Sequence, residues 1–189
     1  MYAAWVEPVA EQLKENRAQV LEFARSLPPE AWGQPTSNEG WSCKDVLAHI
    51  GGGNDRVFQK ILRSAIEREP LDPSILTIDT DTENARGVEE RRGRTPDELI
   101  AELDEAGEEI QELLSGLTDV HKELRQDGFP MSLGEFLQLV QTESHDLEHL
   151  AQIRAALSMD QDRRDRPLPA RPEGGGLSGP ARRQAGAEA

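Results

Sequence analysis

Apolar residues recur three and four positions apart along four segments of the chain, a spacing that predicts amphipathic helices. The first segment ends before Pro28, the second begins at Ser42, the third at Thr95 and the fourth at Ser132. Runs of β-branched and aromatic residues, which are typical of strands, are nearly absent, and aromatic residues make up only 4% of the chain. The pattern therefore predicts an all-α fold.

Candidate capping residues support three of these helix starts. Each is a Ser or Thr followed three residues later by an acidic residue, the arrangement of a capping box. The pairs are Ser42 with Asp45, Thr95 with Glu98, and Ser132 with Glu135. The connection over residues 70–94 is long and has room for a short helix over Thr82–Arg91. We predict a four-helix bundle with a long crossover connection between helices 2 and 3.

The composition changes near Met159. Residues 160–189 are rich in Pro, Gly, Arg and Ala and include few large apolar residues. Such a segment cannot bury enough apolar surface to offset the entropy that it would lose on ordering. We therefore expect a bundle domain over residues 1–159 and a disordered C-terminal tail over residues 160–189.

The formal net charge is −15, from 36 acidic and 21 basic residues. Nucleic acids and anionic membranes both attract basic surfaces, so this charge argues against either partner. Cys43 is the only cysteine, which excludes an intramolecular disulfide and fits a reducing cytosol. No apolar run approaches the ~20 residues that span a bilayer, and residues 1–15 lack the features of a signal peptide. We expect a cytoplasmic protein that binds a small-molecule substrate and that can form a homodimer.

His145 and His149 are four residues apart in the fourth predicted helix, so both imidazoles lie on one helix face. Cβ atoms at this spacing are ~5–6 Å apart, which lets two imidazoles bind one divalent ion. The pair alone is weak evidence, and it is not the zinc-protease motif, in which Glu directly follows the first histidine. Here that position is Asp146, and no histidine follows His149 to supply a third ligand.

His49, in the second predicted helix, is the best candidate for a third ligand. Taken alone, it would be interpreted as a buried core histidine. A polar strip beside the apolar face of the fourth segment changes this interpretation, because buried polar groups need partners. The strip consists of Gln138, Gln141, Thr142, His145 and His149. We predict that His49, His145 and His149 bind one divalent metal ion with at least one coordination position open.

Three neighbouring features bear on this site. Gly51, Gly52 and Gly53 follow His49, and each lowers helix stability by roughly 0.5–1 kcal/mol relative to Ala. Close helix packing and space for a ligand explain them equally well. Cys43 lies six residues before His49, about 240° around an ideal helix, so its thiol is expected to point elsewhere. His121 falls in a predicted loop and is expected to be exposed.

The segment Trp41–His49, which has the form W-S-x-x-D-V-L-x-H, and the H-x-x-x-H pair together resemble the DinB/YfiT-like metalloenzyme family. The resemblance extends from residue 5 to about residue 157. It implies a four-helix bundle in which His49, His145 and His149 hold a divalent metal. Relatives resemble mycothiol-dependent maleylpyruvate isomerase and bacillithiol transferases, which implies a low-molecular-weight thiol as a cofactor. Members were first noticed as damage-inducible proteins, which implies a link to the stress response.

Three neutral imidazoles leave the charge of a divalent ion uncompensated, so the ion can lower the pKa of a bound thiol or water. By ligand type the ion could be Zn, Ni, Fe or Cu. The leading hypothesis is a thiol transferase or isomerase in which the metal activates a thiol such as mycothiol or bacillithiol. One alternative is a metal-dependent hydrolase, for which Glu143, Asp146 and Glu148 are weak candidates for the base. The other is a non-enzymatic, stress-linked metal-binding bundle. The sequence assigns no catalytic or thiol-binding residue.

Overall fold

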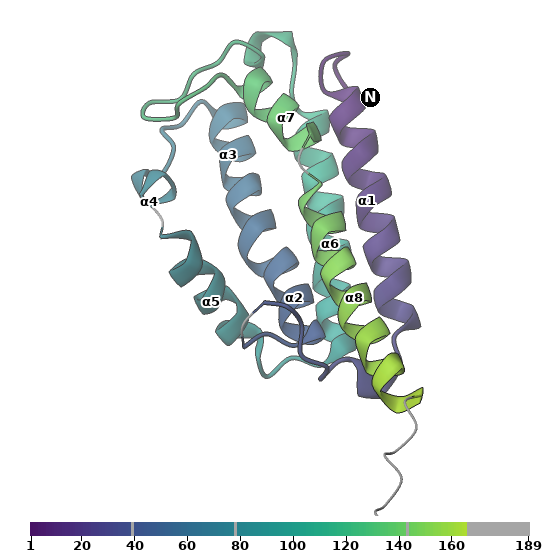
Figure 1. Ribbon diagram of the computed structural model, residues 1–189. Helices are drawn as coiled ribbons and strands as arrows, with labels where there is room; N and C mark the ends of the chain where they lie inside the picture. The colour runs from purple at the N-terminus through teal and green to yellow at the C-terminus, as the bar shows by residue number, and fades with distance from the viewer. Residues whose placement is uncertain (39, 78, 143, 166–189) are drawn as a thin grey trace, which may run out of the picture.

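The computed structural model describes residues 1–38, 40–77, 79–142 and 144–165 (Figure 1). Its α-helices are α1 (Glu7–Ser26), α2 (Cys43–His49), α3 (Asp55–Glu67), α4 (Pro73–Leu76), α5 (Thr80–Arg91), α6 (Pro96–Ser115), α7 (Leu133–Thr142) and α8 (His145–Asp165). A π-helix, η2 (Ile50–Asn54), joins α2 to α3, and the 3-10 turns η1 (Pro29–Ala31) and η3 (Asp119–His121) follow α1 and α6. The described ranges contain no strand, which confirms the predicted all-α class.

The predicted capping residues begin the helices as expected. Ser42 Oγ accepts a hydrogen bond from the backbone of Asp45, and Asp45 accepts one in return. Thr95 and Glu98 form the same capping box at the start of α6. The expected short helix within residues 70–94 is also present as α5, preceded by the single turn α4.

The long helices lie side by side and enclose two apolar clusters (Figure 1). Helix α1 packs against α6, α7 and α8, while α6 packs against α3. One cluster lies near the N-terminal end of α1 and includes Val9, Leu62 and Leu114. The other lies towards its C-terminal end and includes Val20 and Leu150. The two clusters leave a layer between them in which polar residues are buried.

The predicted second helix is interrupted by the π-helix η2 directly after His49. A π-helix inserts an extra residue into the helical register and is frequent at functional sites. On α3 Phe58, Ile61 and Ala65 are buried, whereas Val57 is only half-buried. The apolar stripe predicted for this segment therefore continues past His49, through the π-helix.

The predicted fourth helix is two helices, because α7 ends at Thr142 and α8 begins at His145. Gln138 and Thr142 are exposed on α7, so they do not continue the row formed by His145 and His149. The prediction that the polar strip lies on a single helix face is therefore wrong. The four-helix arrangement itself stays a prediction, since two of the four expected helices are divided. Helix α8 continues past the expected boundary at residue 159 to Asp165, and residues 166–189 of the predicted tail lie outside the described residues.

Two of the three glycines of η2, Gly52 and Gly53, face α5, while Gly51 faces α6. Arg91 of α5 is 1% exposed; its guanidinium donates to both carboxylate oxygens of Glu102 and to the carbonyl of Gly87. A Cβ added at Gly52 would overlap this guanidinium. Of the two explanations for the glycines, close packing therefore accounts for Gly52.

We expect Gly52→Ala to destabilise the fold by about 1–3 kcal/mol, the usual cost of overpacking a filled interior. Arg91 cannot move away from the new methyl group without leaving Glu102. Gly93→Ala is the matched control, because a Cβ there would have no heavy atom within 4 Å, and its effect should stay within about 0.5 kcal/mol. Urea denaturation measures both variants, and equal effects would contradict this account of Gly52.

Candidate metal centre and adjoining cavity

The three predicted histidines converge at the junction of α2 with α8. Nε2 of His145 lies 3.3 Å from Nε2 of His49 and 3.1 Å from Nε2 of His149. Candidate ligand atoms of all three residues lie within 4.8 Å of one another. His49 is 4% exposed, while His145 and His149 are half-buried. The fold thus brings together the residues that the sequence singled out, from two helices far apart in the chain.

His149 is held in the orientation that a metal ligand requires. Its Nδ1 lies 2.9 Å from Oε1 of Gln152, and this oxygen also accepts a hydrogen bond from Asn38 at 3.0 Å. An amide oxygen can only accept, so Nδ1 carries the proton and Nε2 presents its lone pair. Outer partners of this kind fix the tautomer of metal-binding histidines.

His145 also has polar neighbours on its outer nitrogen. Its Nδ1 lies 3.3 Å from Nδ2 of Asn54 and 3.8 Å from Oδ1 of Asp146. An amide nitrogen can only donate, so Asn54 donates to Nδ1 in this orientation of its side chain. Nε2 of His145 faces the other two histidines.

His49 is the most enclosed of the three imidazoles. The ring of Trp41 lies beside it, with ring centroids 5.1 Å apart. Its Nδ1 has no hydrogen-bond partner among the described residues. A Cβ at Gly53 would lie 3.3 Å from this nitrogen and 3.4 Å from Oδ1 of Asn84, so a side chain at Gly53 would press on both polar groups. Asn84 lies on α5, in the long connection.

The imidazoles of His49 and His149 are uncharged at neutral pH. Burial, reinforced by the neighbouring histidines, lowers the pKa of His49 to about 3. Burial also lowers the pKa of His149. Three convergent imidazole nitrogens are the donor set that divalent Zn, Ni or Fe accepts. The residues present therefore fit a metal ion held by His49, His145 and His149.

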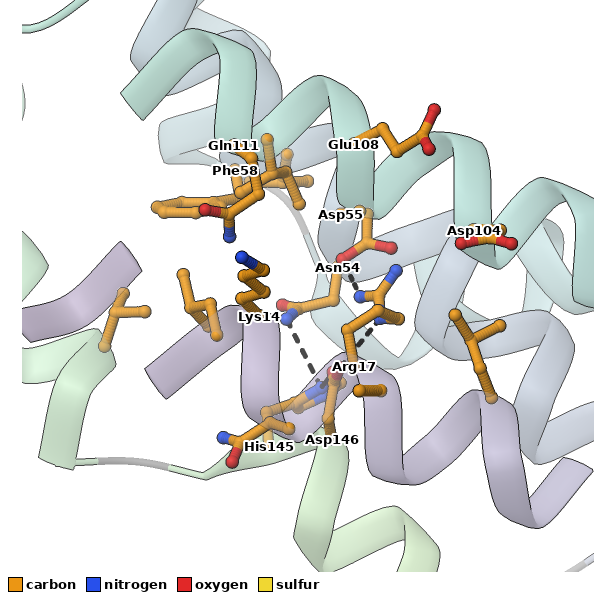
Figure 2. A pocket seen from close by; sticks show the side chains of 18 of the residues that line it. Lys14, Arg17, Asn54, Asp55, Phe58, Asp104, Glu108, Gln111, His145 and Asp146 are labelled. Atoms are coloured by element: carbon orange, nitrogen blue, oxygen red, sulfur yellow. Dashed lines mark hydrogen bonds and ion pairs between the residues drawn. The ribbon is translucent and has the colours of Figure 1, made fainter. Parts of the chain in front are cut away.

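A buried ionic layer lies next to the histidines. Arg17 of α1 donates to Asp55 of α3 at 2.9 Å and to Asp146 of α8 at 3.1 Å (Figure 2). It also donates to the carbonyl of Leu103 of α6 at 2.7 Å. The side chains of Arg17, Asp55 and Asp146 are at most 10% exposed. A single guanidinium therefore joins four helices at the level of the candidate metal centre.

The pKa values of the two carboxylates beside Arg17 are shifted in opposite directions. Burial raises the pKa of Asp55 to about 6, although Arg17 opposes the shift. Burial also acts on Asp146, but its contacts with His145 and Arg17 outweigh it, and the pKa of Asp146 lies below its ordinary value. Asp146 is thus an ionised partner of His145 and Arg17 at neutral pH.

A cavity of about 600 Å³ opens on the other side of this layer (Figure 2). Its walls come from α1, α3, α6 and α7, and they are mostly apolar. His145 and Asp146 line the cavity, which places it directly beside the histidine cluster. Cavities of this size and character accommodate small organic molecules.

Two other sequence expectations have clear outcomes. Cys43 is fully buried in an apolar cluster and is not part of the histidine group, as expected. His121 is only 8% exposed, so the expectation of an exposed side chain is wrong. Its Nδ1 accepts a hydrogen bond from the backbone of Thr118 at 2.9 Å and so caps the η3 turn.

The sequence profile of one family, the mycothiol maleylpyruvate isomerase N-terminal domain, matches residues 13–149. The chain belongs to this family. It is a DinB/YfiT-like family, which confirms the resemblance stated on the histidine motifs. Neither a comparison with curated proteins nor one with solved structures found a match.

The family match contains His49, His145 and His149 but ends before Gln152. The outer partner of His149 therefore belongs to the part of α8 beyond the matched segment. Membership of this family, together with the histidine cluster, identifies the chain as a DinB-like, metal-binding protein related to thiol chemistry. Among the described residues, no helix is long and apolar enough to cross a membrane.

For this member of the family we expect Gln152→Leu to weaken metal binding by about 10- to 100-fold, the usual effect of losing an outer partner of a metal ligand. Leucine cannot accept the Nδ1 proton of His149, so the ring is free to turn or to change tautomer. Gln138→Leu is the matched control, because Gln138 is exposed on α7. Competition with a chelating dye measures both affinities, and equal affinities would exclude the proposed role of Gln152.

Proposed function

We propose that this protein is a metal-dependent enzyme that uses a low-molecular-weight thiol. It either transfers the thiol to a substrate or isomerises the substrate with the help of the thiol. The observation that carries the proposal is the convergence of three imidazole Nε2 atoms beside a largely apolar cavity. His49, His145 and His149 would hold one divalent ion, for which Zn, Ni and Fe are candidates. The family description supports a thiol of the mycothiol type as the cosubstrate.

When bound, a divalent ion at this position acts as a Lewis acid and lowers the pKa of a thiol that contacts it. The chain itself supplies position. Gln152 fixes the ring of His149, and Asp146, held by Arg17, lies next to His145. The cavity would bind the electrophile beside His145 and exclude water from it.

The alternative of metal-dependent hydrolysis needs a general base beside the ion. Of the three candidates, Asp146 is held in an ion pair with Arg17, Glu148 is exposed, and Glu143 lies outside the described residues. The positions of Asp146 and Glu148 give no support to hydrolysis. A thiol-conjugation assay distinguishes the proposed enzyme from a non-enzymatic metal-binding bundle. The homodimer, the cytoplasmic location and the link to stress stay predictions.

The assay uses monochlorobimane as the electrophile and mycothiol, bacillithiol, glutathione or cysteine as the thiol. In the reaction the thiol sulfur replaces chloride, and the thiol proton goes to solvent. We expect the metal-loaded protein to accelerate conjugation of at least one thiol, and the chelator-treated protein and the His49/His145/His149 triple-alanine variant to give only the background rate. Absence of a metal-dependent rate with every thiol would overturn the proposal.

A further inference from the structure

Asp55, a residue of the cavity lining, has a buried oxygen that is unsatisfied. Its side chain is 5% exposed, Oδ1 accepts the hydrogen bond from Arg17, and Oδ2 has no hydrogen-bond partner among the described residues. A buried carboxylate oxygen without a donor destabilises the protein, and such groups are rare unless a ligand, ion or water completes them. Asp55 also lines the cavity, so a bound molecule is the natural source of the missing donor.

The charges around the cavity favour the same kind of group. Asp55 and Asp146 share a single cation, Arg17 (Figure 2). Asp104 and Glu108 of α6 line the cavity as well; Asp104 pairs with Arg25, and Lys14 of α1 is a further cation of the lining. The four carboxylates thus face three cationic side chains. The unsatisfied Oδ2 of Asp55 is an acceptor, so it favours a hydrogen-bond donor or a cation beside it and disfavours a carboxylate.

The rest of the cavity suits an apolar body. Aliphatic and aromatic side chains from four helices form its walls, among them Leu13, Phe58, Ile61, Ile110, Phe136 and Val140. The rings of Phe58 and Phe136 lie 5.8 Å apart, so the cavity presents aromatic surface. An apolar molecule with one polar end would fill the cavity while its polar end reaches Asp55.

We propose that this cavity binds an apolar substrate carrying one hydrogen-bond-donating group. Asp55 determines this specificity through its Oδ2 atom. The inference rests on the proposed function, because it names the class of electrophile that the candidate metal centre acts on. It distinguishes this chain from an enzyme whose substrate is a dicarboxylate such as maleylpyruvate.

The test compares three ligands that share one apolar body: 4-phenylbutylamine, 4-phenylbutanol and 4-phenylbutyrate. Isothermal titration of the metal-loaded, full-length protein should show the amine and the alcohol binding at least ten-fold more tightly than the carboxylate. A tighter amine than alcohol would show that charge contributes, and similar affinities would show that the hydrogen bond suffices. Binding of the carboxylate as tightly as the other two, or binding of none of the three, would overturn the proposal.

Asp55→Asn locates the preference, because the amide can donate where the carboxylate accepts. The variant should lose most of its preference for the amine over 4-phenylbutyrate. Leu139→Trp provides a second readout should Asp55→Asn fail to fold, because Leu139 lines the cavity and is already 40% exposed. It should weaken all three ligands by a similar factor and keep their order. Unchanged affinities in this variant would place the ligands elsewhere and overturn the proposal.

These measurements need neither thiol nor turnover. A lack of thiol conjugation would therefore overturn the proposed function while the ligand preference could still be observed. A preference for 4-phenylbutyrate would overturn the substrate class and leave the thiol assay standing.

Discussion

His49→Ala should abolish stoichiometric binding of a divalent ion at neutral pH, with a loss of affinity greater than about 100-fold. Removing an outer partner of a metal ligand alone weakens binding by about 10- to 100-fold, and His49 is a direct ligand in the proposed site. It is also the only one of the three histidines on α2, so the remaining pair on α8 would hold the ion from one side. Elemental analysis after dialysis against each metal, with dye competition for affinity, measures the effect.

His121→Ala is the control for this experiment. His121 is buried like His49, but it caps the η3 turn and is not part of the histidine group. Its loss should lower stability without changing metal content. Metal content that is unchanged both in His49→Ala and in the triple-alanine variant of His49, His145 and His149 would exclude the proposed site.

The helix starts could be predicted because their causes are local. A capping box needs only two side chains three residues apart, so Ser42 with Asp45 and Thr95 with Glu98 are evident from the sequence. The interruptions could not be predicted in this way. The π-helix after His49 lies against Arg91, which is distant in the chain and reaches Gly52 only once α5 has packed. The division between α7 and α8 carries no proline or glycine that would have marked it.

The ligands of the candidate site could be predicted from the sequence, but the residues that hold these ligands in place could not. His145 and His149 share a face at helical spacing, and His49 is a single polar residue in an apolar segment. The buried layer formed by Arg17, Asp55 and Asp146 was missed, although one signal was available. Between Leu13 and Val20 the core positions of α1 fall on Asn16 and Arg17, and both are buried. Their partners come from other helices, and nothing in the local sequence identifies them.

Arg17→Met should have the largest effect on stability of any single substitution considered, a loss of about 3–5 kcal/mol, because breaking a buried ion pair leaves an uncompensated charge. Methionine keeps the apolar stem but removes the donors that join Asp55, Asp146 and the carbonyl of Leu103. Two carboxylates would then face one another without a cation. Urea denaturation of the metal-free protein measures the loss without a contribution from metal binding.

Arg25→Met on the same helix is the matched control, because Arg25 also pairs with an aspartate, Asp104, but both side chains are about half exposed. Exposed pairs contribute about 0–1 kcal/mol, so this variant should stay close to the parent. Adding Asp55→Asn to Arg17→Met removes one of the two stranded charges and should restore part of the lost stability. Equal effects of the two arginine substitutions would mean that the buried layer does not hold the four helices together. A double variant less stable than Arg17→Met would show that Arg17 stabilises the buried layer through packing around its stem and not through its charge.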